Sequence, residues 1–572
     1  MDNNRYLVNR IKEKVMHVLF FLCAMASIAS VVIICIFIFA NGLPAIGEIG
    51  IFEFLGGRQW RPSHDKYGIF SMIVGSIYVT AGAIIIGVPI GLLCAVFMAK
   101  FCPKWLYKII KPLIELMAGI PSIVYGFFGI VVIVPEIRAI FGGSGKGILT
   151  ASILLGIMIL PTLVSVIETS LRAVPNSYYE GALALGATHE RSVFFTTLPA
   201  AKSGIMAGII LGIGRAIGET MAVVMVAGNQ AIMPEKITSG IRTLTANIVL
   251  EMGYATDLHE DALIATAAVL FVFILIINTS FSLLNREKKD KVIKKRVSGR
   301  YFISSLARIL VYMAASIVAT VVLFLLGYIF VNGIPHLSTR LFEWGYSTEN
   351  NSMLPAIINT FLMMLLTLFI AVPIGVFSAI YMVEYAKRGN KLVAIIRLTT
   401  ETLSGIPSIV YGLFGYLAFV VAFGWSYSMM AGALTLAIMV LPLIMRTTQE
   451  ALLSVPDSFR EGSFGLGAGK RRTVFRVILP SAIPGILSGV LLAAGRIMGE
   501  TAALIFTAGT VAKVPGDVFS SARTLAVHMY CLLNEGLYID DAYATAVILV
   551  VFVLGMNGLS KLIASKFGKT NA

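Results

Sequence analysis

The sequence predicts an all-α integral membrane protein whose twelve transmembrane helices form two parallel repeats of six. Composition is the first reason: the 572 residues are 58% hydrophobic and 13% charged, with a mean hydropathy of +0.88. A soluble protein of this size could not bury so much apolar surface, whereas a membrane protein exposes it to lipid. The second reason is a set of long apolar segments, and the third is a series of motifs that occurs twice.

Each half of the chain contains six apolar segments that reach the roughly 20 residues a helix needs to cross a bilayer. Together they give twelve predicted spans. The first half places them at 16–41, 68–98, 112–136, 148–168, 204–228 and 262–284. The second half places them at 302–333, 353–382, 394–422, 430–449, 484–508 and 542–563.

The first segment follows a basic stretch that contains Arg5, Arg10, Lys12 and Lys14. Its apolar run is too long for a cleaved signal peptide and lacks a good small-residue cleavage site, so we expect an uncleaved signal anchor. When the N-terminus is placed in the cytoplasm, most Lys and Arg residues fall on the inside. The positive-inside rule therefore favours both termini in the cytoplasm.

The most polar stretch, NREKKDKVIKKRVSGR at 285–300, separates the two halves. A solvated cytoplasmic linker near anionic lipid explains its basic residues. The chain is therefore predicted to have a six-helix unit at 1–284, a linker at 285–300 and a second six-helix unit at 301–572.

Charge and cysteine usage exclude other classes. The net charge of +15 is dispersed among apolar runs, so membrane lipids are expected as partners and nucleic acid is not. The five cysteines show no paired or metal-like spacing, so neither a disulfide framework nor a metal site is expected.

The internal repeat is most evident in the phrase GIPSIVYG, which occurs at 119–126 and again at 405–412, a shift of 405 − 119 = 286. Further motifs follow in the same order at a shift of 281. Both halves have six spans and start on the same side, so the repeats are parallel and the pathway is expected between them. The later motifs are EGALALGA (180–187) with EGSFGLGA (461–468), and GRAIGET (214–220) with GRIMGET (495–501).

The GRxxGET motifs carry the strongest chemical signal because they place charge inside predicted spans. Arg215 and Glu219 are four residues apart, as are Arg496 and Glu500, so each pair is predicted to share one helix face. A charge at the bilayer centre costs roughly 2.5–3.5 kcal/mol, so these residues should face the interface between the halves.

Two arginines on opposite sides could hold one tetrahedral anion, because the planar guanidinium matches its oxygens. Thr220 and Thr501 add hydroxyls beside them. The alternative is that each Arg–Glu pair only stabilises the bundle.

The GIPSIVYG phrase predicts a kinked third span in each half, because Pro121 and Pro407 remove a backbone donor. Free carbonyls and hydroxyls at membrane depth are tolerated only against protein or a water-filled cavity. The phrase therefore predicts pathway-lining side chains, with tight helix packing around a hinge as the alternative. The candidates are Ser122, Tyr125, Ser408 and Tyr411.

The polar loop between the fourth and fifth spans, 170–202 in the first half and 446–483 in the second, forms the last repeated feature. Each loop predicts a short helix, a glycine turn, and a second helix that ends before proline. A partner protein could bind a surface helix of this kind and transmit its own movement to the membrane helices. The coupling residues are Glu180, Gly186, Leu198, Pro199, Glu461, Gly467, Leu479 and Pro480.

These loops resemble the EAA loop of ABC-importer permeases, although Gly181, Gly462 and Ser463 replace the usual alanines. The wider pattern, GIPSIVYG followed by GRxxGET, resembles the Pst-type phosphate importer over nearly the whole chain. The first half, with WRPSHDKYGIF at 60–70, looks PstC-like, and the second half, with NSMLPAIINTF at 351–361, looks PstA-like. The resemblance implies a type I ABC importer fold in a fused PstC–PstA chain.

The resemblance also implies partners in a bacterial-type cytoplasmic membrane. An ABC ATPase homodimer (PstB-like) would dock on the coupling loops, and an extracytoplasmic phosphate-binding protein (PstS-like) would dock outside. This chain should bind no cofactor, because GGSGKG at 142–147 lacks the Walker A pattern and lies outside. It is expected to be a permease and no enzyme, with ATP and Mg held by the ATPase and no catalytic residues of its own.

Two other functions stay open. A permease for another oxyanion, such as sulfate or molybdate, would use the same two arginines. A twelve-span secondary transporter driven by an ion gradient is the alternative from another class, and the paired coupling loops argue against it.

Overall fold

The computed structural model describes residues 2–285, 300–387 and 389–568. Residues 286–299 of the predicted linker lie outside the described residues. Contacts divide the chain into two compact units, each described by itself below. The first unit is Gly42–Pro335, and the second unit joins Met1–Asn41 to His336–Ala572.

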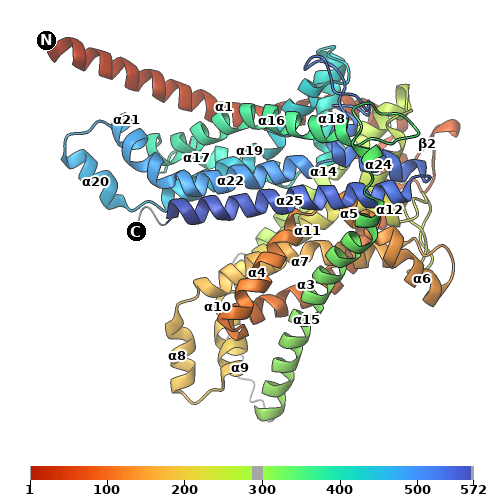
Figure 1. Ribbon diagram of the computed structural model, residues 1–572, viewed down its shortest axis with the longest axis horizontal. Helices are drawn as coiled ribbons and strands as arrows, with labels where there is room; N and C mark the ends of the chain where they lie inside the picture. Colours follow the sequence, from red (N-terminus) through yellow and green to blue (C-terminus); the bar gives the residue numbers. More distant parts are fainter. Residues whose placement is uncertain (1, 286–299, 388, 569–572) are drawn as a thin grey trace. The chain divides into compact units, whose positions relative to one another are not determined.

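The first unit is a helix bundle centred on α3 (Phe70–Val96), α7 (Ile148–Ala173) and α11 (Lys202–Gly218), which pack along one another (Figure 1). Small residues allow the close approach: a Cβ on Gly87 of α3 would lie 2.9 Å from the carbonyl oxygen of Gly156 in α7. The other helices are α2 (Ile51–Gly56), α4 (Lys104–Gly119), α5 (Ser122–Phe128), α6 (Val134–Phe141), α8 (Asn176–Ala184), α9 (His189–Ser192), α10 (Leu198–Ala200), α12 (Met221–Val226), α13 (Leu244–Glu251), α14 (Asp257–Asn285) and α15 (Arg300–Gly333).

The second unit repeats this arrangement with α16 (Leu354–Ile380), α19 (Met429–Leu453) and α22 (Leu479–Gly499) as its centre. Here Gly375 of α16 is the close contact, with a Cβ position 2.7 Å from Ile444 Cγ2 of α19. The other helices are α1 (Asp2–Ile49), whose residues up to Asn41 belong to this unit, α17 (Lys391–Ser404), α18 (Ser408–Gly415), α20 (Asp457–Gly465), α21 (Lys470–Thr473), α23 (Ala502–Ile505), α24 (Leu525–Glu535) and α25 (Ile539–Gly568).

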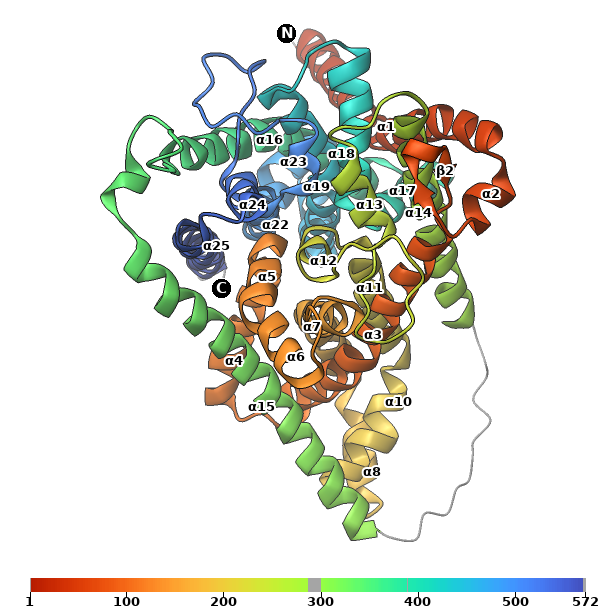
Figure 2. The same cartoon turned by 90° about the vertical axis from the view of Figure 1, so that its right-hand side faces the viewer.

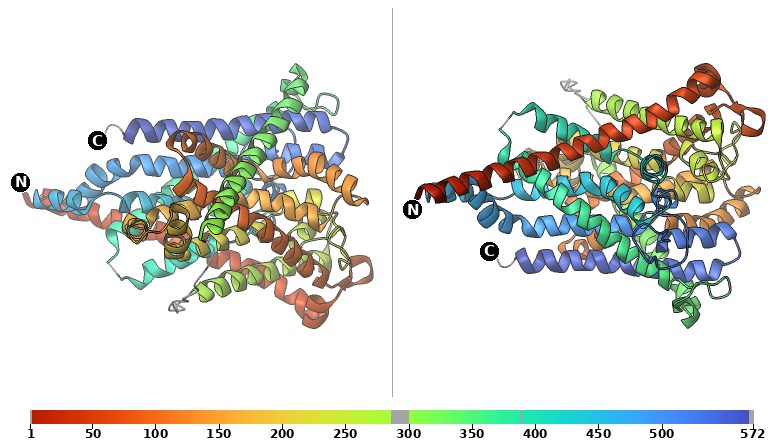
Figure 3. Two further views of the ribbon diagram at one scale, coloured as in Figure 1. Left: turned by 90° about the horizontal axis from the view of Figure 1, so that it is seen from below. Right: turned by 90° about the horizontal axis from the view of Figure 1, so that it is seen from above.

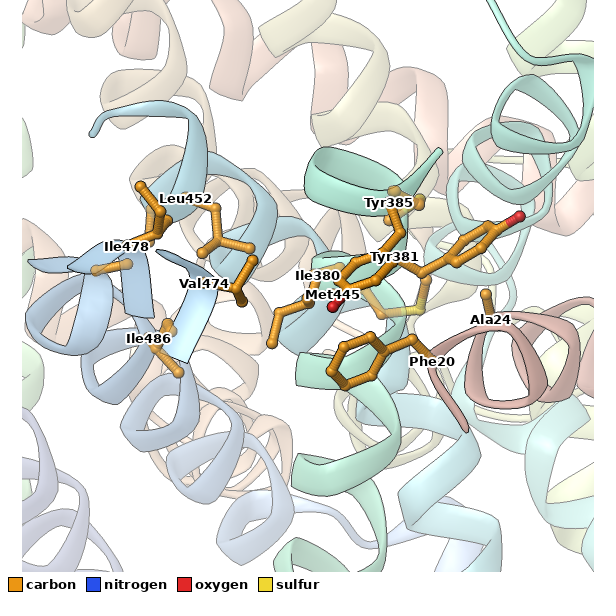
Figure 4. Close-up of a cluster of buried hydrophobic side chains, with 14 of the residues drawn as sticks. Phe20, Ala24, Ile380, Tyr381, Tyr385, Met445, Leu452, Val474, Ile478 and Ile486 are labelled. Atoms are coloured by element: carbon orange, nitrogen blue, oxygen red, sulfur yellow. The ribbon is translucent and has the colours of Figure 1, made fainter. Parts of the chain in front are cut away.

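The long helix α1 (Figure 3) packs on helices of the second half of the sequence. Phe20 is fully buried, and its ring lies 5.2 Å from that of Tyr385 and 6.2 Å from that of Phe475. Figure 4 shows Phe20 and Ala24 entering a cluster that includes Tyr381. The first helix of the first repeat is therefore part of the second unit.

Helix α15 makes the reciprocal exchange and packs on α3 and α4 of the first unit (Figure 2). Its Tyr312 ring lies 5.1 Å from Phe97, and its Phe324 ring lies 5.9 Å from Phe128. The compact units thus differ from the predicted six-helix units by an exchange of first helices. The predicted repeat boundaries, 1–284 and 301–572, stay a prediction.

Ten helices in the described part of the chain are long and apolar enough to cross a membrane. An eleventh span results if the segments His189–Ala200 and Lys202–Gly218, bent by 73°, count as one. The shorter apolar helix Ser408–Ala422 falls in the predicted ninth span. The all-α membrane class is confirmed, and the count of twelve stays a prediction.

One small element departs from the all-α class. Strands β1 (Trp60–Arg61) and β2 (Lys66–Tyr67) form an antiparallel hairpin in which Trp60 pairs with Tyr67. Both aromatic rings are buried, and their centroids lie 5.6 Å apart. The hairpin is the WRPSHDKY segment that precedes the second predicted span.

Candidate functional site

The GRxxGET motif ends a helix in both units. Helix α11 stops at Gly218 and α12 starts at Met221, while α22 stops at Gly499 and α23 starts at Ala502. Glu219 (φ −70°, ψ 133°) and Glu500 (φ −76°, ψ 132°) have extended backbones. The prediction that each Arg–Glu pair shares one helix face was therefore wrong. The break falls inside the apolar segments predicted at 204–228 and 484–508.

The break has a local cause. The glycine before each glutamate favours helix termination, and the glutamate offers its side chain to the next helix. Glu219 Oε1 accepts a hydrogen bond from the Ala222 amide at 3.3 Å, and Glu500 Oε1 accepts one from the Ala503 amide at 3.3 Å. Each carboxyl thus satisfies a donor that the helix start would leave unpaired.

The threonines of the motif are buried beside this contact. Thr220 is 2% exposed and donates to the Gly218 carbonyl at 3.3 Å. Thr501 is 1% exposed, and its hydroxyl has no hydrogen-bond partner among the described residues. The motif therefore places a buried hydroxyl next to each glutamate.

The GIPSIVYG phrase also breaks a helix, where the sequence predicted a kink. Helix α4 stops at Gly119 and α5 starts at Ser122, and Pro121 between them is extended (φ −59°, ψ 144°). Pro407 adopts the same conformation before α18 (φ −62°, ψ 148°). Proline suits a helix start, where its missing N–H leaves no hydrogen bond unmade.

The two tyrosines of the phrase bridge these breaks. The Tyr125 hydroxyl donates to the Met117 carbonyl at 2.8 Å, and the Tyr411 hydroxyl donates to the Leu403 carbonyl at 2.7 Å. Both rings are almost fully buried, at 0% and 1% exposure. This placement favours the packing alternative for Tyr125 and Tyr411 over a pathway-lining role, whereas Ser122 and Ser408 are half-buried.

Within each unit the two motifs meet. A Cβ on Gly126 would lie 3.1 Å from Ala222 Cα, and a Cβ on Gly412 would lie 2.9 Å from Ala503 Cα. In the second unit, the Ser408 hydroxyl also donates a hydrogen bond to the Glu500 carboxyl. Serine at the start of one broken helix and glutamate at the end of another therefore form one site.

The arginines lie one helical turn before each break. Arg215 is half-buried, and its Nη1 donates to Thr162 Oγ1 of α7 at 2.9 Å. Arg496 is more exposed, and its charge acts on Glu500 and Tyr411 of the same unit. The two arginines belong to different compact units, so their convergence on one anion stays a prediction.

The coupling loops contain the predicted short helix and glycine turn. Gly186 (φ +82°) follows α8, and its amide donates to Leu183 at 2.8 Å while the Ala187 amide donates to Ala182 at 3.1 Å. Gly467 (φ +78°) ends α20 with the same pair of bonds. This is a Schellman arrangement, whose positive φ favours glycine.

The surface of these loops is largely open. Leu185 and Leu466, each next to the turn glycine, are 91% exposed, and Glu180 and Glu461 are also exposed. An exposed leucine at each helix tip is an apolar contact for another protein.

The prediction that the second loop helix ends before proline was wrong. In both loops the helix widens into a π-turn, Val193–Thr197 or Val474–Ile478, and continues. Leu198-Pro199 and Leu479-Pro480 then form the first turn of α10 and α22. The wide turn separates the helix segments, so proline stands where a missing N–H costs little.

No motif in the sequence predicts the contact that holds the first coupling loop. Glu190 is 4% exposed and binds two residues of α15: Ser304 Oγ at 2.8 Å and Arg308 Nε at 2.7 Å. The partners are more than 110 residues away in sequence, and neither lies in a repeated motif.

Two membrane-embedded repeats, each with broken helices and a projecting loop, define a multi-pass membrane transport permease. A family profile described as "Binding-protein-dependent transport system inner membrane component" matches residues 87–290 and 371–569. The chain belongs to this family. The predicted resemblance to ABC-importer permeases is thereby confirmed.

Individual relatives match somewhat less than half of the chain or most of it. "Probable ABC transporter permease protein YqgH" of Bacillus subtilis is 39% identical over 266 residues, which cover 45% of this chain and 86% of the relative. "Phosphate transport system permease protein PstC" of Mesorhizobium japonicum is 34% identical over 265 residues, covering 43% and 81%. "Phosphate transport system permease protein PstA homolog" of Mycoplasma pneumoniae is 25% identical over 577 residues, covering 88% of each chain.

Proposed function

We propose that this chain is the membrane permease of an ATP-driven importer for inorganic phosphate. The observation that carries the proposal is the repeated helix break, where an arginine, a glutamate that caps the next helix and a buried threonine stand together in each unit. The names of the PstC and PstA relatives support phosphate as the substrate. Sulfate or molybdate would make similar contacts, so the test includes both.

In this proposal phosphate passes between Arg215 and Arg496. Each guanidinium offers a planar pair of donors that matches two phosphate oxygens. The hydroxyls of Thr220, Thr501 and Ser408 stand beside that path. Phosphate would then exchange water for a sequence of charge-assisted hydrogen bonds.

The ATPase partner would act on the two coupling loops. An ABC ATPase homodimer would grip the exposed tips at Leu185 and Leu466, and its closure on ATP would move both loops. The helices that continue from the loops, α10–α11 and α22, end at the two broken-helix sites. Loop movement would therefore reach the arginines directly and alternate the access of the pathway.

The remaining partners follow the same orientation. A separate phosphate-binding protein would deliver the anion to the outer loops, and both termini would lie in the cytoplasm of a bacterial-type inner membrane. ATP and Mg would be held by the ATPase.

The experiment is uptake of radiolabelled phosphate by proteoliposomes that contain the permease, the ATPase and the binding protein. Arg215→Gln and Arg496→Gln should each lower uptake roughly 10- to 100-fold, because each removes a charge-assisted contact of about 1.5–3 kcal/mol. Arg138→Gln is the matched control, since Arg138 is exposed and bonds only the Ser144 carbonyl among described residues.

Competition by unlabelled sulfate and molybdate shows which anion the permease transports. Normal uptake by Arg215→Gln and Arg496→Gln, with ATPase still bound, would remove the two arginines from the pathway. Full competition by sulfate at equal concentration would contradict phosphate as the substrate.

A further inference from the structure

A glutamate carboxyl already occupies the donors at each helix break. Glu219 accepts from the Ala222 amide and Glu500 accepts from the Ala503 amide, both at 3.3 Å. The same contact occurs in two units whose other side chains differ, and it joins the same two positions of the repeat. It is therefore a shared feature of the site.

In the second unit the carboxyl has further donors. Besides the Ala503 amide, the Ser408 hydroxyl donates to Glu500, and the charge of Arg496 acts on it. A backbone N–H, a hydroxyl and a guanidinium are the donor types that bind phosphate oxygens in proteins. The carboxyl thus stands where an oxyanion would find its hydrogen bonds.

Ordinary helix capping does not explain the arrangement. Threonine is a good N-cap residue, and Thr220 and Thr501 occupy the N-cap positions of α12 and α23. Neither hydroxyl caps its helix: Thr220 donates backwards to Gly218, and Thr501 has no partner among the described residues although it is 1% exposed. The glutamate makes the bond that the threonine could make.

We propose that the carboxylates of Glu219 and Glu500 mimic the transported oxyanion and occupy its hydrogen-bond donors. Each carboxyl holds the donors of the helix break while the site is empty and leaves them when the anion arrives. The inference rests on the proposed function, because it needs an oxyanion that passes this site. It assigns the glutamates a gating role, which differs from holding the arginines in place.

The proposed role predicts that the anion leaks across the membrane when the carboxyl is removed. If the carboxyl competes with the anion, its removal opens the donors to substrate in every state of the cycle. The anion then exchanges across the membrane without ATP, and accumulation falls because the gradient drains. A glutamate that only positions the arginine would give the opposite pattern: transport is lost and no leak appears.

The experiment compares two readouts in the same reconstituted complex: ATP-driven phosphate accumulation, and exchange of labelled for unlabelled phosphate without ATP. Glu500→Ala and Glu219→Ala should each raise ATP-free exchange roughly tenfold over wild type, because a competing charge-assisted contact is removed. Glu500→Gln is the matched variant and should raise exchange less, since its amide oxygen still accepts from the Ala503 amide. Exchange at the wild-type level in both alanine variants would overturn the proposal, whether accumulation is lost or kept.

Two further measurements keep the test decisive. Co-purification of the ATPase reports folding, and Glu500→Asp replaces an alanine variant that fails to assemble, because the shorter chain withdraws the carboxyl and should also raise exchange. A wild-type complex that accumulates sulfate or molybdate but no phosphate contradicts the proposed substrate alone. The same exchange comparison, run with the accumulated anion, then decides the gating role.

Discussion

The two units hold an equivalent arginine in the same backbone contact but surround its charge differently. Arg242 of the first unit and Arg523 of the second are 523 − 242 = 281 residues apart, which is the shift of the repeat. Arg242 Nε donates to the Asn229 carbonyl at 3.0 Å, and Arg523 Nε donates to the Thr510 carbonyl at 2.7 Å. The acceptors are also 281 apart, so the repeat preserves this contact.

The surroundings of the two guanidinium groups differ. Arg242 pairs with the Glu251 carboxylate and with Asn247 Oδ1 at 3.0 Å. The residues equivalent to Glu251 and Asn247 are Leu532 and His528. Arg523 contacts His528 Nδ1 at 3.3 Å, and its guanidinium lies 5.0 Å from the centre of the Tyr346 ring. In the described part of the chain no carboxylate pairs with Arg523.

The difference teaches that the repeat constrains backbone geometry more tightly than charge. An arginine that bonds a loop carbonyl fixes the loop, and either a carboxylate or an aromatic face can accompany its charge. The fused chain therefore has one neutral and one positive arginine site at the predicted outer end of its two units.

Removing the carboxylate from the first site should have the largest effect. Glu251 is 6% exposed and accepts from Arg242, from Trp60 Nε1 at 2.6 Å and from His259 Nε2 at 2.9 Å. Glu251→Gln leaves the mostly buried guanidinium of Arg242, which is 17% exposed, without its counter-charge. This change should lower the unfolding free energy by about 3–5 kcal/mol. Thermal unfolding of the purified protein in detergent measures it.

The control for that prediction is Glu235→Gln, which removes an exposed glutamate of the same unit and should change the unfolding free energy by less than about 0.5 kcal/mol. If Glu251→Gln unfolds at the same temperature as Glu235→Gln, the carboxylate does not neutralise Arg242, and the two arginine sites are equivalent.

The joints of the coupling helices give a second contrast. Arg460 of α20 pairs with Glu384 at 2.8 Å and donates to the Val455 and Leu452 carbonyls. At the equivalent position in α8, the Tyr179 hydroxyl hydrogen-bonds His189 Nδ1 at 2.6 Å. At this equivalent position, the second coupling helix is thus held by a buried ion pair and the first by a hydrogen bond.

Removing these two contacts should destabilise the two coupling helices by different amounts. Glu384→Gln should loosen α20 by about 2–3 kcal/mol, since Arg460 keeps its carbonyl acceptors, and Tyr179→Phe should loosen α8 by about 1 kcal/mol. Hydrogen–deuterium exchange should therefore accelerate roughly 30- to 150-fold in α20 and about fivefold in α8. Equal acceleration in the two helices would refute the contrast.

Sequence reasoning found what is local and missed what depends on packing. The apolar runs gave the spans, and Gly186 and Gly467 gave the turns, because hydropathy and positive φ are properties of short segments. The breaks at Gly218 and Gly499 were missed, because an apolar run carries no mark of a carboxyl reaching the next helix. The partner of Phe20 was missed for a related reason: an apolar helix face fits several neighbours, and Tyr385 is far away in sequence.

The pH response should be the smallest difference between the two arginine sites. Burial, aided by the nearby Arg523, lowers the pKa of His528 from 6.5 to about 3. The folded protein therefore keeps His528 neutral, whereas the unfolded chain takes up a proton below pH 6.5, so the stability that the neutral ring contributes is present above pH 6.5 and is lost as pH falls toward 3. Between pH 7 and pH 5 this loss should reach about 2 kcal/mol, and His528→Asn, which installs the side chain of the first site, should abolish it. Unfolding temperatures recorded at both pH values measure the loss, and an equal shift in wild type and His528→Asn would show that another group titrates.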